Sequence, residues 1–205
     1  DTWHCKPGAY QSHEEFVSEA TGPLMGRHQV KIDWHGKAGE VIATEFREIA
    51  AFAAPGGLLV DFTSLLTTEL ENVKLDGDPQ HAGFQFRASN EVNEKTAKET
   101  IYIRKDSVGK PGEAINSGEH IKNQPWKGMS FVIGGERFTC CYLDRPDNPK
   151  PAVYSERNYV RFGSYFFNEV SPDEPLLVRY RLFLKAGEMT HEQIAELAAN
   201  FVASP

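Results

Sequence analysis

Apolar and polar residues alternate along most of the chain, as they do in strands that bury one face. Strand-forming stretches separated by Gly, Pro, Asn and Asp predict about nine strands. They cover residues 14–20, 28–34, 40–53, 57–70, 81–89, 99–104, 129–133, 137–144 and 175–185. Several stretches reach ten or more residues without helical spacing, so we expect an all-β fold, a large antiparallel β-sandwich.

Helical spacing is convincing only at the C-terminal end of the chain. Thr190 and Gln193 have the spacing of a capping box, in which each side chain binds the backbone N–H of the other residue. The apolar stripe behind them consists of Ile194, Leu197, Ala198, Phe201 and Val202. We therefore predict a terminal helix over residues 190–203, packed on a single β-sandwich domain that spans residues 1–205.

Charge and hydropathy argue against two classes of partner. The chain has 22 basic and 29 acidic residues, a net charge of −7 and no run of Lys or Arg, so nucleic acid is not an expected partner. The longest apolar stretch, residues 49–60, is interrupted by Pro55-Gly56-Gly57 and is shorter than the roughly 20 residues that cross a bilayer. No membrane contact is expected. The compartment, cytoplasmic or exported, and the oligomeric state stay open.

The sequence lacks the common motifs of metal, cofactor and nucleophile chemistry. The seven histidines have no metal-ligand spacing such as HExxH, and the chain has no P-loop, GxGxxG turn or GxSxG elbow. Of the three cysteines, Cys140 and Cys141 are adjacent and would point to opposite faces of a strand, so a disulfide scaffold is not indicated. We expect no metal and no cofactor.

The strand predicted over residues 81–89 separates an apolar face from a polar one. Alternation places Phe84, Phe86 and Ala88 toward the core, and it places on the opposite face His81, Gly83, Gln85 and Arg87. Imidazole, amide and guanidinium groups on one face, with a glycine that leaves room above the sheet, are typical of a ligand platform. An ordinary hydrated face is the alternative, and the sequence leaves both open.

Two long connections, residues 105–128 and 145–174, interrupt the strands, and such segments are often functional. The candidate ligand-binding residues in or beside them are Asn116, Glu119, Trp126, Asp144, Asn148, Arg157 and Tyr159. Aromatic rings stack on sugar rings, while amide, carboxylate and guanidinium groups bind hydroxyls, so this combination is typical of carbohydrate recognition. Turn formation explains Asp144 and Asn148 as well, and the alternative for Trp126 is a packing lid.

Four motifs in order resemble those of a known family. They are Ala82-Gly83 through Arg87, Asn116-Ser117-Gly118-Glu119 followed by Trp126, Asp144 through Pro149, and Arg157 through Tyr159 leading to Phe167-Asn168. Over residues 28–185 the chain resembles an uncharacterised bacterial family labelled PmoA-like, or methane oxygenase PmoA. Arg145 stands where that family has His. A family region with a His-His-Arg-Gly-Leu motif would precede Asp1, so the chain is similar to the C-terminal part of a longer one.

The resemblance implies a β-sandwich related to the galactose-mutarotase and lyase supersandwiches, which are found among genes for sugar breakdown. A particulate methane oxygenase subunit is an integral membrane protein, whereas this sequence has no spanning segment and no clustered metal ligands, so methane oxygenation is not expected. Stoichiometric copper or iron in the purified protein would support the redox metalloenzyme that the label implies.

These observations support a carbohydrate-active enzyme, a hydrolase, lyase or epimerase that binds a small-molecule or oligosaccharide ligand on a polar concave sheet face. His81 is the acid–base candidate, and Arg87 and Arg157 would neutralise a carboxylate or a developing oxyanion. The partner carboxylate would be Glu119 or Asp144. The other residues expected to bind substrate are Gln85, Asn116, Trp126, Asn148 and Tyr159. A non-catalytic carbohydrate-binding or structural module that uses the same face is the alternative.

Overall fold

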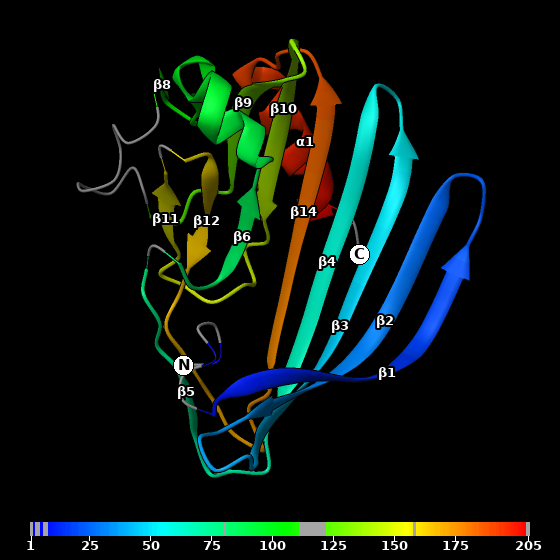
Figure 1. Ribbon diagram of the computed structural model, residues 1–205, viewed down its shortest axis with the longest axis vertical. Coiled ribbons are helices and arrows are strands. Elements are labelled where there is room, and N and C mark those ends of the chain that lie inside the picture. Colours follow the sequence, from blue (N-terminus) through cyan, green and yellow to red (C-terminus); the bar gives the residue numbers. More distant parts are fainter. Residues whose placement is uncertain are drawn as a thin grey trace. The chain divides into compact units, whose positions relative to one another are not determined.

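The computed structural model describes residues 2, 5, 8–79, 81–110, 122–157 and 159–203, and it is built mainly of antiparallel β-sheets (Figure 1). The all-β, antiparallel sandwich fold predicted from the alternation is confirmed. The largest sheet has nine strands in the order β1-β2-β3-β4-β14-β10-β9-β7-β8. These strands are β1 (Tyr10–Thr21), β2 (Met25–His35), β3 (Val41–Ala54), β4 (Gly57–Thr67), β7 (Ile101–Ile103), β8 (Val108–Gly109), β9 (Trp126–Ile133), β10 (Glu136–Asp144) and β14 (Leu176–Ala186).

Two smaller sheets and three helices complete the described part of the chain. A three-stranded sheet has the order β11-β12-β6. Its strands are β11 (Val153–Glu156), β12 (Arg161–Tyr165) and β6 (Phe84–Arg87). The second small sheet pairs β5 (Val73–Leu75) with β13 (Asn168–Val170). The helices are η1 (Val92–Thr96), η2 (Ala97–Glu99) and α1 (His191–Ala203).

Contacts between residues divide the chain into two compact units. Unit 1 consists of Asp1–Ala53, Val60–Leu75 and Asn168–Arg179. Unit 2 consists of Ala54–Leu59, Asp76–Phe167 and Tyr180–Pro205. The single domain expected from the length of the chain stays a prediction.

Unit 1 contains a buried carboxylate that is satisfied entirely by side chains of the same unit. Glu45 is 2% exposed and accepts hydrogen bonds from Arg47 Nε and Nη2, both at 2.8 Å. Trp34 Nε1 and Ser64 Oγ also donate to it, at 3.0 and 2.7 Å. Burial of a charge is tolerated when it is paired and hydrogen-bonded, so this cluster stabilises β3 against its neighbours.

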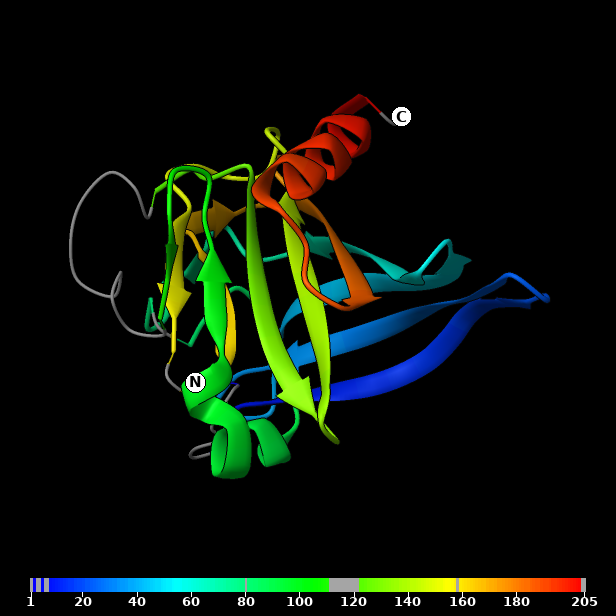
Figure 2. The same ribbon diagram turned by 90° about the horizontal axis from the view of Figure 1, so that it is seen from above.

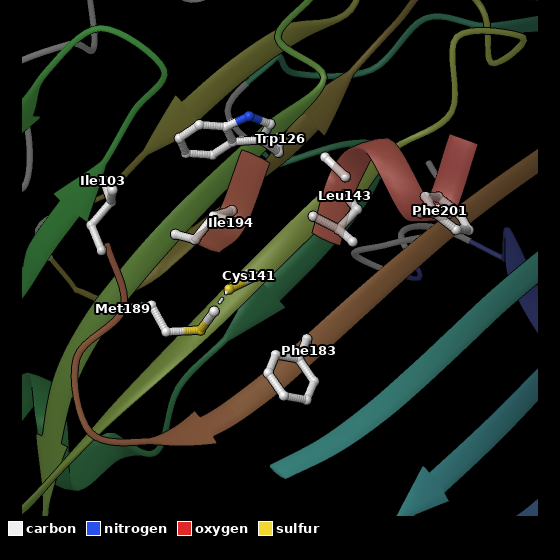
Figure 3. Close-up of a cluster of buried hydrophobic side chains, with 9 residues drawn as sticks. Ile103, Trp126, Cys141, Leu143, Phe183, Met189, Ile194 and Phe201 are labelled. Carbon is white, nitrogen blue, oxygen red and sulfur yellow. Dashed lines mark hydrogen bonds between the residues drawn. The ribbon is translucent and has the colours of Figure 1, made fainter. Parts of the chain in front are cut away.

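Unit 2 has layers on both faces of β10, and Figure 2 shows α1 beside β9 and β10. Tyr142 of β10 faces the three-stranded sheet, where its ring centroid lies 5.6 Å from that of Tyr154 and 5.8 Å from that of Phe162. The next side chains along the strand point the other way, and Cys141 and Leu143 join the hydrophobic cluster around α1 (Figure 3). Because successive side chains of a strand point to opposite faces, β10 contributes side chains to both layers.

Helix α1 begins with the capping box that the sequence predicts. The Thr190 N–H donates to Gln193 Oε1 at 3.0 Å, and the Gln193 N–H donates to Thr190 Oγ1 at 3.4 Å. Ile194 and Phe201 of the predicted stripe are buried, whereas Val202 is 43% exposed. Within the described residues, the helices fall short of the length and apolarity that a membrane-crossing helix needs.

Several predicted boundaries are wrong in the middle of the chain. The segment 145–174 is not one irregular connection, because it contains β11, β12 and β13. These strands have only four, five and three residues, too few for alternation to be recognised. Strand β6 begins at Phe84 instead of residue 81, since Gly83 has a φ of +81° and turns the chain just before it. Strand β9 begins at Trp126 instead of residue 129.

Candidate functional site

The candidate site lies on the outer face of the three-stranded sheet, which points away from the aromatic core of unit 2. Arg161 of β12 lies directly opposite Arg87 of β6, and Gln85 is two residues before Arg87. Opposed residues, and residues two apart on a strand, share a face, so these three side chains project from the same side. Phe84 projects from the inner side, where its ring stacks on Tyr180 at a centroid distance of 4.8 Å.

A tight turn joins β11 to β12 and carries Tyr159. The Arg157 N–H donates to the Arg161 carbonyl at 2.9 Å, and the Val160 N–H donates to the Arg157 carbonyl at 3.1 Å. Tyr102 Oη of β7 donates to both of these carbonyls, at 3.1 and 3.2 Å. Val160 has a φ of +58°, a left-handed conformation that costs on the order of 1–3 kcal/mol. The fold thus holds a strained turn in place under Tyr159.

Three arginines surround the Tyr159 side chain. Arg161 Nη2 and Arg157 Nε donate hydrogen bonds to Tyr159 Oη at 2.9 and 3.1 Å. The guanidinium carbons lie 5.3 Å (Arg161), 5.4 Å (Arg157) and 5.9 Å (Arg87) from the centre of the Tyr159 ring. Cations at such distances are attracted by the π electrons of a ring. The cluster gathers three positive charges in a chain whose net charge is −7.

His81 joins the Tyr159 phenol to a carboxylate. His81 Nδ1 lies 2.5 Å from Asp78 Oδ2, and His81 Nε2 lies 3.5 Å from Tyr159 Oη. An ionised carboxylate only accepts hydrogen bonds, so the imidazole proton belongs on Nδ1 and leaves Nε2 as an acceptor toward the phenol O–H. The His81 N–H also donates to the Asp78 carbonyl, at 2.8 Å, which fixes the turn that brings both side chains together. Carboxylate, imidazole and phenol therefore form an acid–base chain.

The electrostatics of this cluster favour an anionic ligand. Burial lowers the pKa of the Arg161 guanidinium, and Tyr159 opposes that effect. The neighbouring cations Arg157 and Arg87 lower the pKa further, and Asp78 acts in the opposite direction. Like charges held close together destabilise one another, and a bound anion relieves that repulsion. A carboxylate is well matched to guanidinium groups because it can accept two parallel hydrogen bonds from one fork.

Gln85 and Ser155 continue the polar face beside the arginines. Both lie opposite Gly163 in the central strand, one from each side. A Cβ at Gly163 would lie 2.8 Å from Gln85 Cδ, so the glycine makes room for the amide. Gln85 Nε2 donates to the Ala82 carbonyl at 2.9 Å, but Gln85 Oε1 and Ser155 Oγ are buried and have no hydrogen-bond partner in the described part of the chain. Buried polar atoms nearly always have a partner, so these two oxygens call for a donor beyond the described side chains.

The structure brings four of the residues predicted from the sequence together: His81, Arg87, Arg157 and Tyr159. Gln85 lies on the same face. Two further predicted residues, Asn116 and Glu119, lie outside the described residues. The remaining three occupy positions in which packing or turn formation accounts for them.

Trp126 is 3% exposed and packs in the hydrophobic cluster with Ile194 of α1 (Figure 3). This position matches the packing alternative for Trp126. Asp144 is 2% exposed and accepts hydrogen bonds from Asn148 Nδ2 at 2.6 Å and Lys150 Nζ at 2.8 Å. Burial raises the pKa of the Asp144 carboxyl, and the hydrogen bond from Lys150 counteracts it. Asp144 and Asn148 therefore hold the proline-rich turn after β10.

Sequence reasoning did not include Asp78, Ser155 or Arg161 among the candidate site residues. Asp78 is three residues before His81, a spacing at which a turn brings two side chains together, and this was the available signal. Arg161 lies two residues after Tyr159, but the sequence did not reveal β12 and therefore did not show which face Arg161 would occupy.

A buried ion cluster lies on the inner face of β11, beneath the site. Glu156 is 1% exposed and accepts hydrogen bonds from Arg104 Nε at 2.9 Å and Lys127 Nζ at 2.6 Å. Burial alone would raise the pKa of Glu156, but these two cations hold it below the usual value. Burial lowers the pKa of Lys127, against the raising effect of Glu156. Because Arg157 directly follows Glu156, the cluster anchors the strand that leads into the Tyr159 turn.

Fold and site together define an antiparallel β-sandwich protein that gathers arginine, tyrosine and histidine on the outer face of a small sheet. The chain belongs to DUF6807, a family of unknown function, whose model matches residues 1–199. No curated protein matches the chain. The PmoA-like resemblance stays a prediction. In the part of the chain that the structure describes, no three or more His, Cys, Asp and Glu side chains are grouped so that they could hold a metal ion.

Proposed function

We propose that the protein is a carbohydrate-active enzyme that binds a saccharide on the outer face of the three-stranded sheet and transfers protons through His81 and Tyr159. The observation that carries the proposal is the position of His81, 2.5 Å from Asp78 and 3.5 Å from Tyr159. An imidazole oriented by a carboxylate and facing a phenol can accept and return a proton. The arginines beside it supply donors for an oxygen-rich ligand.

A saccharide is the ligand class that the surrounding groups support. The guanidinium groups donate hydrogen bonds, whereas Gln85 Oε1 and Ser155 Oγ are buried acceptors without a partner in the described residues. A sugar hydroxyl can both donate and accept, so it satisfies both kinds of group. The PmoA-like resemblance, with its relation to sugar-processing supersandwiches, supports the same ligand class and is the finer family assignment that we propose.

Among carbohydrate reactions, lyase or epimerase chemistry is better supported than hydrolysis. Most glycosidases place two carboxyl groups on either side of the scissile bond. Among the described residues, the carboxylate of this cluster is Asp78. Asp144 is buried and accepts hydrogen bonds from Asn148 and Lys150. A carboxylate that orients an imidazole, as Asp78 orients His81, suits proton abstraction.

The test is a panel of neutral and acidic oligosaccharides, assayed for binding by calorimetry and for turnover by product analysis. We expect binding and turnover of at least one of them. His81→Ala should reduce turnover by about 100-fold or more with a smaller effect on binding, as for loss of a general acid–base group. The matched control is His13→Ala, which removes an exposed histidine of unit 1 and should change neither property. Binding without turnover would leave a recognition module instead of an enzyme, and no binding at all would refute the proposal.

A further inference from the structure

We infer that the saccharide is a uronate and that the protein cleaves its glycosidic bond by β-elimination, with Tyr159 as the group that removes the proton. The inference rests on the proposed function and names its substrate class and reaction. It starts from a difference among the three arginines. Arg157 and Arg161 donate to Tyr159 Oη, whereas Arg87 is exposed and has, in the described residues, a hydrogen bond to Asn90 at 3.3 Å.

Arg87 is therefore the member of the trio that is placed to meet a ligand carboxylate. It lies directly opposite Arg161 in the sheet, and its guanidinium carbon is 5.9 Å from the centre of the Tyr159 ring. Among the described residues, Arg87 is paired with the neutral amide of Asn90, and Asp78 contacts His81. A neutral sugar would leave the guanidinium of Arg87 without a counter-charge, whereas a uronate would supply an anion that binds a guanidinium fork through two hydrogen bonds.

A carboxylate bound at Arg87 makes the adjacent C5–H of the sugar acidic, because negative charge that develops on the carboxylate is stabilised by the cation. His81 Nε2 takes the phenol proton of Tyr159, and Asp78 stabilises the imidazolium that forms. The Tyr159 oxygen, which accepts hydrogen bonds from Arg157 and Arg161, then takes the proton from C5. The C5–H electron pair forms the C4=C5 double bond while the C4–O bond breaks.

The proton balance closes without a further reactant. The leaving C4 oxygen takes the proton from Tyr159, and His81 returns its own proton to the phenol oxygen. The products are an unsaturated uronate and a free hydroxyl, and no water is consumed. Epimerisation would need a second proton donor on the opposite face of the sugar ring. Elimination on one face needs only one proton-carrying group, and His81 and Tyr159 lie together in the described cluster.

The experiment uses the whole chain with polygalacturonate, alginate, hyaluronan and heparan-type oligosaccharides, each beside its carboxyl-reduced neutral counterpart. The conjugated C4=C5 double bond absorbs in the ultraviolet, so elimination is followed directly by absorbance. We expect one of the acidic members to bind and to give this product, and its reduced counterpart to bind at least 10-fold more weakly. Tyr159→Phe should lower kcat by about 100-fold or more and change KM little. Arg87→Ala should raise KM by about 10- to 100-fold.

The matched control is Arg27→Ala, which removes an arginine of unit 1 that pairs with Glu48 and should leave both constants unchanged. Tyr159→Phe must retain the thermal unfolding midpoint of the parent, so that loss of turnover is separated from loss of fold. If only neutral saccharides bind or react, the uronate inference fails and the proposed function stands. If a uronate binds and gives an epimer, a hydrolysis product or no product, the elimination fails. If no saccharide binds, both proposals fail together.

Discussion

The buried ion cluster beneath the site gives the sharpest prediction for stability. Glu156→Gln keeps the shape of the side chain but removes its charge, and it leaves Arg104 and Lys127 as buried cations without a counter-charge, with side-chain exposures of 8% and 0%. Hydrogen bonds to a charged group contribute about 1.5–3 kcal/mol each. Two cationic partners lose this contribution, so we expect the free energy of unfolding to fall by about 3–5 kcal/mol, the usual result of breaking a buried pair by removing one partner.

The pH dependence of this loss can be worked out from the two shifted groups. The pKa of Glu156 is below its ordinary 4.5 in the folded state, so its stabilisation is present above pH 4.5 and is lost as the pH falls through the folded value. The pKa of Lys127 is below its ordinary 10.5, so protonating this group costs stability as the pH falls from 10.5 through the folded value. In Glu156→Gln nothing opposes the burial of Lys127. The deficit of the variant should therefore shrink below pH 4.5 and also as the pH rises toward 10.5.

The assay is urea unfolding of the parent and the variant, followed by fluorescence and circular dichroism between pH 3 and 10. The matched control is Glu169→Gln, the same chemical change in an exposed pair with Lys74 at 3.4 Å, which should cost less than about 1 kcal/mol. Lys127→Met should cost less than Glu156→Gln, because Glu156 keeps its hydrogen bonds from Arg104. A loss below about 1 kcal/mol for Glu156→Gln, or a deficit that does not vary with pH, would refute the reasoning.

Three further predictions concern packing, the Tyr159 turn and the helix cap. Gly128→Ala places a Cβ 2.7 Å from the buried Ile194 Cδ1 and should lower the free energy of unfolding by about 1–3 kcal/mol. Adding Ile194→Val removes that atom and should recover part of the loss. If the double variant loses as much stability as the two single variants together, this clash is not the cause. Tyr102→Phe removes the hydroxyl that donates to both carbonyls of the Tyr159 turn. It should lower the free energy of unfolding in urea by about 1–3 kcal/mol and weaken ligand binding. Unchanged stability and binding would show that the turn does not depend on this hydroxyl. Thr190→Ala removes the cap of α1 and should lower the free energy of unfolding, measured by thermal unfolding, by about 0.5–2 kcal/mol. Thr190→Ser keeps a hydroxyl and should retain most of the stability. Equal losses in both variants would argue against a capping role.

The long strands and the terminal helix could be predicted because their signals are local. Alternation over ten or more residues is visible in β3 and β14, and the Thr190–Gln193 pair marks the start of α1 within four residues. The short strands β11 and β12 have no such signal. They are stabilised by pairing with each other, by the pairing of β12 with β6, and by burial of aromatic side chains. Their neighbours in space, which a linear pattern does not show, decide that they form.

Parts of the candidate site could likewise be predicted from local signals, and other parts could not. Phe84 and Arg87 occupy opposite faces of β6 because successive side chains of any strand do so, and the amino-acid sequence alone determined that separation. Trp126 and Tyr159 both occur in segments expected to be loops, yet the first is buried against α1 and the second is surrounded by arginines. Only the tertiary structure decided between these outcomes, because residues from separate strands must meet before burial, charge and hydrogen bonding can act on a side chain.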